Sequence, residues 1–347
     1  MSREEASAGS SQELARIMRL TTAYWESAVL ATACALDLFD VLDGGARTAE
    51  EVAARAHTDL RATRMLLEAC TALGLLTRHM DSGAPRYASA PAAARYLARS
   101  SPTCMRDAVQ WGLAQYPIWG QLTQSVRSGQ PAVSPESHLG GDPEQTRAFV
   151  RAMHQRALSM ARGIVPFLPM DGVQELLDVG GGSGALACLL AQQYPSLRAT
   201  VLDLPSVVAI ADTWIAQMGL SDRVRTRAGD ATQEDYGVNA FDAVLFFGVL
   251  HQMAPDTIPL MLERAYRALR PGGQVLICDL MTDDTGHRTP FVALFALQML
   301  LTSHRGHVFS VSDGARWLEQ AGFEHVAGQA LPPPLPYTIL RAQRRFT

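Results

Sequence analysis

Residues 175–184 restrict the possible folds of this chain more than any other segment. The apolar stretch 175–179 predicts a buried β-strand, and Gly180, Gly182 and Gly184 follow it at alternate positions. Glycine adopts the positive φ angles of a tight turn and lets another molecule approach the backbone closely. A buried strand that ends in such a turn predicts an α/β fold with a nucleoside site beside the loop.

Three carboxylates distinguish between two kinds of nucleoside site. Residues 180–185 also satisfy the G-x-G-x-x-A fingerprint of dinucleotide binding, with Asp203 about twenty residues further on. Asp178, however, ends the first strand, where dinucleotide phosphates need no acid but the amino acid part of a cofactor can use one. Asp230 ends another apolar stretch and can accept a hydrogen bond from an adenine amino group. Together these residues predict a site for S-adenosylmethionine.

The basic residues limit the chemistry, because all 30 of them are arginine and the chain contains no lysine. Schiff-base and pyridoxal phosphate chemistry, Tyr-x-x-x-Lys hydride transfer and a lysine general base are therefore excluded. The net charge of −4 gives no basic surface of the kind that binds nucleic acid or an anionic membrane. Because no signal peptide pattern and no bilayer-spanning apolar stretch is present, we expect a cytoplasmic protein with a small-molecule partner.

The amino-terminal part predicts a winged-helix domain over residues 12–100, all-helical apart from one hairpin. Residues 1–11 are small and polar, so we expect them to be disordered. A winged helix often binds DNA, but the candidate recognition helix carries only Arg61 and Arg64 as basic residues, which disfavours that function. The predicted helical segments and the hairpin are residues 12–42, 48–56, 60–75 and 76–88.

The remaining chain predicts a helical linker followed by a doubly wound sheet. Residues 101–172 keep a helical pattern, interrupted by a Gly/Pro-rich loop at 128–143. From residue 173 to 347 strands alternate with helices, which predicts a Rossmann-like domain with its ligand crevice at the carboxyl ends of the strands. The predicted strands are residues 175–179, 199–203, 224–228, 241–247 and 274–279, with an antiparallel pair near 325–330 and 337–343.

His251 is the candidate general base. It follows the predicted strand 241–247, so it belongs at the edge of the sheet where the cofactor site is expected. Methyl transfer to a hydroxyl requires removal of the hydroxyl proton, and an imidazole with an ordinary pKa of about 6.5 suits this role. Asp279 ends the next strand and can orient the imidazole.

Six short motifs, spread over almost the whole chain, carry a resemblance to a known family. They are Leu177-Asp178-Val179-Gly180-Gly181-Gly182-Ser183-Gly184, Asp203-Leu204-Pro205, Gly229-Asp230, Leu250-His251, Arg270-Pro271-Gly272-Gly273 and Ala321-Gly322-Phe323. The chain resembles the small-molecule O-methyltransferases, which include plant caffeate and flavonoid enzymes, acetylserotonin methyltransferase and bacterial enzymes of natural-product tailoring. The resemblance implies S-adenosylmethionine-dependent methylation of a hydroxyl on an aromatic or polyketide-type small molecule, in a homodimer formed through the amino-terminal domain.

The resemblance also implies functions for individual residues. Asp203 would hold the ribose hydroxyls, Asp230 and Ala231 the adenine, and His251 would be the general base. The expected cofactor site comprises Asp178, Gly180, Gly182, Gly184, Asp203, Leu204, Asp230, Ala231 and Phe247, the last lying along the cofactor. The expected acceptor pocket is lined by Phe149, Met153, His154, Met299 and Ser303.

The surroundings of the histidine depart from the family pattern. The family usually follows its histidine with an aspartate and an aromatic residue, where this chain has Gln252 and Met253. Val308 stands where a second acid commonly flanks the base. Asp279 is then the only acid expected to polarise His251.

These departures leave other reactions open on the same scaffold. His304 and His307 lie in the segment expected to reach the acceptor pocket, and with His251 they can form a metal site for methylation of carbon, as in an alpha-keto acid. A relative that keeps the cofactor without transferring a methyl group is a further alternative. Because ligand spacing alone is weak support for a metal site, we expect no metal.

Overall fold

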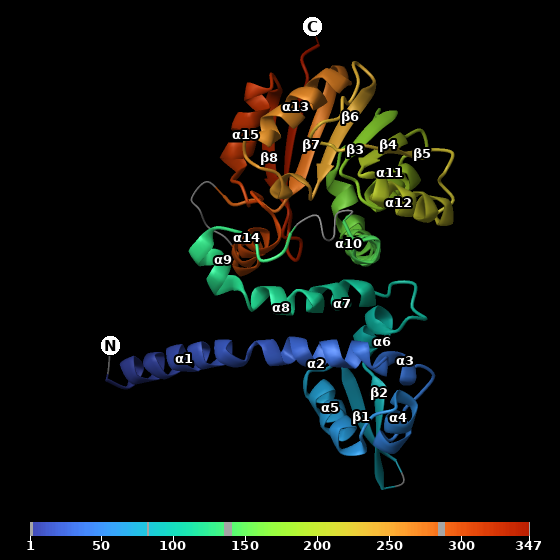
Figure 1. The fold of residues 1–347 in the computed structure, drawn as a ribbon, viewed down its shortest axis with the longest axis vertical. Helices are drawn as coiled ribbons and strands as arrows, with labels where there is room; N and C mark the ends of the chain where they lie inside the picture. The colour runs from blue at the N-terminus through green and yellow to red at the C-terminus, as the bar shows by residue number, and fades with distance from the viewer. Residues whose placement is uncertain (1–2, 82, 135–140, 284–288, 347) are drawn as a thin grey trace. The chain divides into compact units, whose positions relative to one another are not determined.

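The computed structural model describes residues 3–81, 83–134, 141–283 and 289–346 (Figure 1). The chain divides into two compact units, Met1–Ala114 and Gln115–Thr347. Each unit has its own buried apolar core, so each is described by itself.

The first unit is a winged helix. Its hairpin joins β1 to β2 in antiparallel register, from Leu76 opposite Ser89 to Asp81 opposite Ala84, so the domain is not all-helical. The predicted start of α4 is confirmed, because Thr48 and Glu51 form a capping box. The elements are α1 (Arg3–Thr22), α2 (Tyr24–Ala35), α3 (Leu38–Val41), α4 (Ala49–Ala56), α5 (Leu60–Ala72), β1 (Leu76–Asp81), β2 (Ala84–Ser89), α6 (Pro91–Leu97) and α7 (Arg106–Ala114).

Two predictions for this unit are wrong. Residues 3–11 belong to α1 and are not a disordered segment. Their arginine, glutamate and alanine residues have high helix propensity, and they precede a segment with a helical apolar pattern. The predicted helix 12–42 is divided among α1, α2 and α3. The last break falls at Asp37, whose φ of 53° is left-handed and ends the helical path.

A buried arginine joins the elements of the first unit. The Arg106 side chain is only 2% exposed and forms ion pairs with Asp37 and Asp40. Its guanidinium also donates to the Cys34 carbonyl at the end of α2. An arginine fork that meets two carboxylates and a carbonyl carries little unpaired charge, so α7 is fixed to the turn between α2 and α3.

The second unit is built on one mixed sheet with the strand order β5-β4-β3-β6-β7-β9-β8 in the described residues (Figure 1). Neighbours from β5 to β7 are parallel, and β9 pairs antiparallel with both β7 and β8. All predicted strands are confirmed as β3 (Glu175–Val179), β4 (Arg198–Asp203), β5 (Val224–Ala228), β6 (Phe241–Phe247), β7 (Leu269–Asp279), β8 (Glu324–Ala330) and β9 (Thr338–Gln343).

Strand β7 begins earlier than predicted. Phe241 of β6 pairs with Leu269, and Ala243 pairs with Gln274, so a bulge of extra residues separates the two pairs. The motif Arg270-Pro271-Gly272-Gly273 lies in this bulge, where Gly272 has a φ of 78°. The pair between Phe241 and Leu269, which comes before the motif, was not predicted.

Helices cover both faces of the sheet. Leu176 of β3 belongs to the core under α10, α11 and α12, whereas Leu177 and Val179 belong to the core under α13 and α15. This alternation follows from the period of two in a strand. The helical elements are α8 (Tyr116–Trp119), α9 (Leu122–Ser128), α10 (Pro143–Ile164), η2 (Val165–Phe167), α11 (Ala185–Gln193), α12 (Pro205–Gln217), η3 (Leu250–Gln252), α13 (Thr257–Ala268), α14 (Pro290–Thr302) and α15 (Val311–Gln320).

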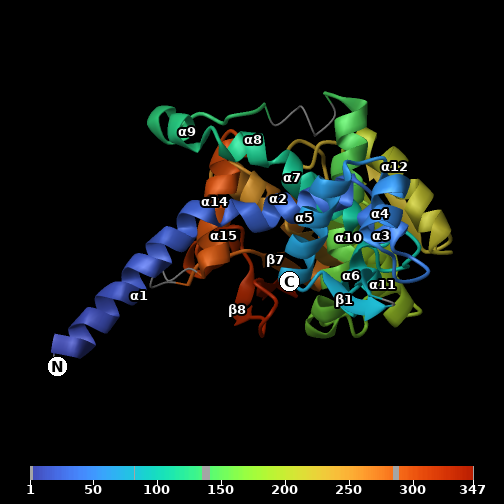
Figure 2. The ribbon, with the colours of Figure 1, turned by 90° about the horizontal axis from the view of Figure 1, so that it is seen from below.

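The topology places a switch point between β3 and β6. From β3 the chain continues to β4 and β5 on one side, whereas β6 and β7 extend the sheet on the other. The long helix α10 packs against α11 and α12 beside this point (Figures 1 and 2). Ligands of open α/β sheets bind at such a point, outside the carboxyl ends of the strands. In the described part of the chain, every helix is too short or too polar to cross a membrane.

Candidate active site

The glycine loop after β3 is shaped by close contacts on one side and open space on the other. Gly180 and Gly182 have φ angles of 68° and 58°. A Cβ atom on Gly180 would lie 2.5 Å from Val249, and one on Gly181 would lie 2.5 Å from the Asp178 carboxylate. A Cβ on Gly182 would meet nothing within 4 Å. The loop is therefore packed closely against Val249 and Asp178, and it leaves room for a ligand beside Gly182.

Asp203 at the end of β4 holds this loop. Its Oδ2 accepts a hydrogen bond from the Gly182 N–H at 2.7 Å, and its Oδ1 accepts one from the Leu204 N–H at 2.7 Å. Burial raises the pKa of Asp203, and the two amide bonds act against that rise. Each carboxylate oxygen keeps a second lone pair, so Asp203 can also accept from a ligand hydroxyl.

Asp178 is a buried carboxyl beneath the loop. Its side chain is 1% exposed, and neither of its oxygens has a hydrogen-bond partner in the described residues. Burial, with a smaller contribution from Asp203, raises the pKa of Asp178 to about 7. A buried acid without a donor is unusual in a folded protein and fits a site that receives the cationic amino group of S-adenosylmethionine.

We expect Asp178→Asn to stabilise the cofactor-free protein at pH 8 more than at pH 5. The raised pKa means that the folded state keeps a proton which the unfolded state loses above about pH 4, so stability is lost as the pH rises through about 7. Asparagine carries no titrating proton. The free energy of unfolding of Asp178→Asn, relative to that of wild type, should therefore increase by about 1–3 kcal/mol from pH 5 to pH 8. Thermal unfolding measures the gain, and Asp222→Asn, at an exposed site, is the control. An equal gain at both pH values would contradict the assignment.

Asp230 lies in a closed turn after β5. Its Oδ1 accepts from the Thr232 N–H at 2.8 Å and from the Thr232 hydroxyl at 2.7 Å, and its Oδ2 accepts from the Gln233 amide at 3.2 Å. The preceding Gly229 donates its N–H to the Asp203 carbonyl at 2.9 Å. The turn that carries Asp230 and Ala231 is thereby attached to the end of β4, beside the glycine loop.

The His251 imidazole is oriented by Asp279. Its Nδ1 lies 2.6 Å from Asp279 Oδ1, and its backbone N–H donates to Asp279 Oδ2 at 3.2 Å. The Leu280 N–H also donates to Oδ1, at 2.8 Å. An ionised carboxylate can only accept, so with such a partner the Nδ1 atom donates and the Nε2 atom keeps a lone pair. Asp279 is fully buried and His251 is 8% exposed, so the pair is largely shielded from water.

The backbone and ring of His251 are held from a second direction. The His307 N–H donates to the His251 carbonyl at 2.8 Å. A Cβ on Gly306 would lie 2.8 Å from the same carbonyl oxygen, so only glycine fits there. The ring of Phe295 on α14 meets the imidazole edge to face, with centroids 4.8 Å apart. Val308 is buried where the family often has a second acid.

The expected acceptor-pocket residues lie on two helices. On α10, Phe149 and Met153 are partly buried, and His154 Nδ1 lies 2.8 Å from the Ser183 hydroxyl of the glycine loop. On α14, Met299 is buried. The Ser303 hydroxyl donates to the Met299 carbonyl at 2.6 Å and accepts from the Gly306 N–H at 2.9 Å, so it closes the end of the helix.

Tyr337 lies beside the expected site residue Phe247 and was not predicted from the sequence. Its ring packs against Phe247, with centroids 5.6 Å apart, and its hydroxyl contacts Met160 of α10 at 3.6 Å. It also packs against the small apolar cluster that includes Val292 of α14. Burial raises its pKa. Tyr337 precedes Thr338, which pairs with Asp279 in the sheet. The sequence alone does not give this strand pairing, so the position of Tyr337 near Asp279 could not be predicted.

The three histidines of the alternative metal site are not arranged as ligands. The His307 ring lies near Phe309 and Trp317, with centroids 6.1 Å and 6.2 Å away. His304 is exposed after the end of α14. Among the residues that the structure describes, no three His, Cys, Asp or Glu side chains are placed to hold a metal ion.

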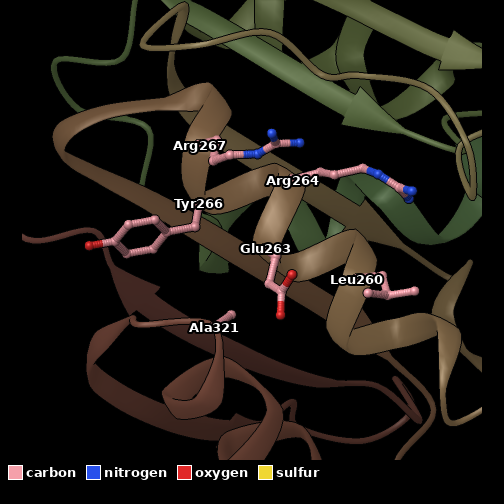
Figure 3. A pocket seen from close by; sticks show the side chains of 6 residues that line it. All are labelled: Leu260, Glu263, Arg264, Tyr266, Arg267 and Ala321. Carbon is pink, nitrogen blue, oxygen red and sulfur yellow. The ribbon is translucent and has the colours of Figure 1, made fainter.

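A hollow beside α13 is lined by other residues (Figure 3). Arg264 in this hollow donates to the Thr232 carbonyl at 2.5 Å, and Arg267 lies 3.9 Å from Asp235. Both guanidinium groups therefore already face oxygen atoms of the chain. The hollow is lined by Leu260, Glu263, Arg264, Tyr266, Arg267 and Ala321, and it contains none of the expected site residues.

Two family models match the chain. The O-methyltransferase domain matches residues 119–324, and the O-methyltransferase dimerisation domain matches residues 18–99. The two matches fall in the second and first structural units respectively.

Known proteins of similar sequence include two O-methyltransferases of Streptomyces. The chain is 32% identical to the tetracenomycin polyketide synthesis 8-O-methyl transferase TcmO of Streptomyces glaucescens, over 94% of this chain and 96% of the relative. It is also 32% identical to the 3-hydroxy-5-methyl-1-naphthoate 3-O-methyltransferase of Streptomyces sahachiroi, over 88% of each.

Solved structures agree with these matches. SibL, an S-adenosylmethionine-dependent methyltransferase solved in its apo form, is 30% identical, with a TM-score of 0.74 over 96% of this chain and 99% of that one. The glycine loop with its two carboxylates and the matched domains lead to one assignment. The chain belongs to the O-methyltransferase family and is an S-adenosylmethionine-dependent methyltransferase.

Proposed function

We propose that the enzyme methylates a hydroxyl group of an aromatic or polyketide-type small molecule in the tailoring of a natural product. The His251–Asp279 pair carries this proposal, because it presents an oriented base at the carboxyl edge of the sheet. The acceptor class is supported by the relatives that act on a tetracenomycin polyketide and on a hydroxynaphthoate.

Each acidic residue of the cofactor site would bind a different part of S-adenosylmethionine. Asp203 would accept from the ribose hydroxyls while it keeps the loop folded through Gly182. Asp230 would accept from the adenine amino group through its Oδ2 atom, and Asp178 would balance the charge of the amino acid part. The bound cofactor supplies an electrophilic methyl group on a positively charged sulfur.

His251 would remove the proton of the acceptor hydroxyl. Its Nδ1 atom is occupied by Asp279, so the proton would be taken up at Nε2, and the adjacent carboxylate would stabilise the imidazolium that forms. Removal of water from the site strengthens this pairing, and both side chains are shielded here.

The single supporting acid favours an acidic acceptor. The buried Val308 offers no charge near the base, so Asp279 is the only acid that we assign to it. A phenol has a pKa of about 10, far below that of an alkyl alcohol, and ring substituents lower it further. A phenolic acceptor therefore suits this base better than an aliphatic alcohol does.

The acceptor would bind between α10 and α14. Phe149 and Met153 come from the first helix, with His154 beside them at the glycine loop. Met299 comes from the second helix, and Ser303 caps its end. Both helices contribute to the core around Tyr337, which supports their placement on either side of the crevice. The helical linker predicted at residues 101–172 would contribute to this pocket through α10.

We also propose a homodimer formed through the first unit. The O-methyltransferase dimerisation domain matches residues 18–99. Large apolar side chains on α1 and α2 are more than half exposed in the single chain, which is the pattern of a surface covered by a second copy. These side chains are Leu14, Ile17, Met18, Leu20 and Trp25.

Product analysis tests the reaction. We expect methyl-labelled S-adenosylmethionine to yield label on oxygen when the enzyme is incubated with a panel of phenols and hydroxy-polyketides. The matched control uses the same acceptors with the reacting hydroxyl replaced by hydrogen, which should acquire no label. Label found only on carbon, or no label on any hydroxyl despite measured cofactor binding, would contradict the proposal.

A further inference from the structure

We propose that His154 is a positioning residue that holds the glycine loop in its cofactor-binding shape. Its Nδ1 atom lies 2.8 Å from the Ser183 hydroxyl, within hydrogen-bond distance. Its ring stacks on the indole of Trp214 in α12, with centroids 4.0 Å apart and an angle of 16° between the planes. The imidazole therefore joins α10, the glycine loop and α12.

Ser183 is the only residue of the loop that offers a side chain for such a bond. Residues 180–184 read Gly-Gly-Gly-Ser-Gly, and the other four have no side-chain atoms to hold. Glycines lose much conformational freedom when a loop is ordered, so a loop of this composition depends on its few fixed points. Ser183 is 5% exposed, so its hydroxyl has little access to water as an alternative partner.

The contacts that hold the loop come from two elements. From β4, Asp203 accepts from the Gly182 N–H at 2.7 Å and the Leu202 carbonyl accepts from the Gly180 N–H at 2.8 Å. From α10, which packs against α11 and α12, His154 reaches Ser183. Loss of the His154 contact would leave these contacts from β4 in place but would release the Ser183 side chain, so the cofactor would have to order that part of the loop on binding.

The environment of His154 suits a neutral imidazole. Burial lowers its pKa to about 4, and Trp214 covers one face of the ring. A neutral ring has one donor and one acceptor nitrogen, so it can pair with a hydroxyl in either direction. A protonated ring would lose the acceptor and would be poorly solvated between the two helices.

His154 also lies next to Met153, which we place in the acceptor pocket. The same turn of α10 therefore carries one side chain toward the proposed acceptor and one toward the glycine loop. The conformation of the glycine loop and the position of α10 beside the acceptor are therefore linked through this turn. This part of the inference rests on the proposed function, whereas the effect on cofactor binding does not.

Calorimetric binding of S-adenosylhomocysteine tests the inference. His154→Phe keeps a ring on Trp214 but removes the hydrogen bond, and Ser183→Ala removes its partner. We expect each variant to bind about three- to tenfold more weakly, the range for one lost hydrogen bond. The double variant should bind no more weakly than either single variant, because both remove the same interaction.

Two further variants separate positioning from general damage. His154→Asn retains a polar atom near the position of Nδ1 and should recover most of the affinity. Ser159→Ala, an exposed serine on the same helix, should leave it unchanged. In steady-state kinetics, Ser183→Ala should raise the KM for S-adenosylmethionine by a larger factor than it lowers kcat, whereas Ser159→Ala should leave both parameters unchanged.

Two results would overturn the inference. One is unchanged affinity in both Ser183→Ala and His154→Phe. The other is multiplication of the two losses in the double variant, which would mean that the residues act independently. Ser183→Ala keeps the test decisive if His154→Phe fails to fold. Because S-adenosylhomocysteine binding requires neither an acceptor nor His251, failure of the proposed acceptor chemistry would not alter this series.

Discussion

The His251→Ala variant should turn over about 10²–10⁴ times more slowly than wild type while it binds the cofactor with nearly unchanged affinity. The structure places Nε2 of this residue as the free nitrogen of an imidazole whose Nδ1 is bound to Asp279 at 2.6 Å. Alanine removes the group that would accept the hydroxyl proton, but the glycine loop and Asp203 stay in place.

Turnover at saturating cofactor and acceptor, together with calorimetry of S-adenosylhomocysteine, measures both parts of this expectation. His79→Ala, at an exposed position of β1, is the control for loss of a histidine in general. Asp279→Asn should produce a smaller but substantial loss, because the amide can orient the ring without stabilising its charge. Turnover equal to wild type in His251→Ala would rule out His251 as the base.

Asp203→Ala should weaken cofactor binding by about tenfold to a hundredfold. The variant leaves the Gly182 and Leu204 N–H groups without their acceptor, and it removes the oxygens assigned to the ribose hydroxyls. Hydrogen bonds to a charged group contribute about 1.5–3 kcal/mol each, and part of that is recovered by water. The apparent KM for S-adenosylmethionine should rise with the dissociation constant, and kcat should fall less.

Calorimetry of S-adenosylhomocysteine again gives the affinity directly. Asp212→Ala is a suitable control, because this exposed aspartate of α12 accepts a hydrogen bond from the Thr226 hydroxyl at 2.7 Å rather than from the glycine loop. Asp203→Asn should lie between wild type and alanine, since one amide oxygen can still accept from the loop. Wild-type affinity in Asp203→Ala would place the cofactor elsewhere.

The sheet and its acidic residues could be predicted because their signals are local. Strands such as 175–179 are buried on both faces, so they appear as continuous apolar runs, and the glycines after them mark turns. Carboxyl ends of parallel strands meet at one edge, so Asp203 and Asp279 could be assigned to one crevice before the structure was known. The pairing of Asp279 with His251 follows from the same rule.

The contacts of the helices could not be predicted in this way. The 3.6-residue period of α10 identifies a helix, but it does not show which residues His154 contacts. Ser183 and Trp214, its two partners, lie in two other segments of the chain. Likewise, Phe295 lies in a helix that is apolar on nearly every side, so the sequence did not show which face of this helix contacts His251. Such contacts depend on the angles at which helices cross, which the sequence pattern does not contain.

The segment between α14 and α15 sets the distance from the acceptor wall to the base. The His307 N–H binds the His251 carbonyl, Ser303 binds Gly306, and Gly306 has no room for a Cβ atom. The end of α14 therefore cannot move independently of the peptide that carries the imidazole. With α14 as the proposed wall of the acceptor pocket, exchange of side chains along this helix would change which hydroxyl is methylated, while the spacing between the helix and His251 stays constant.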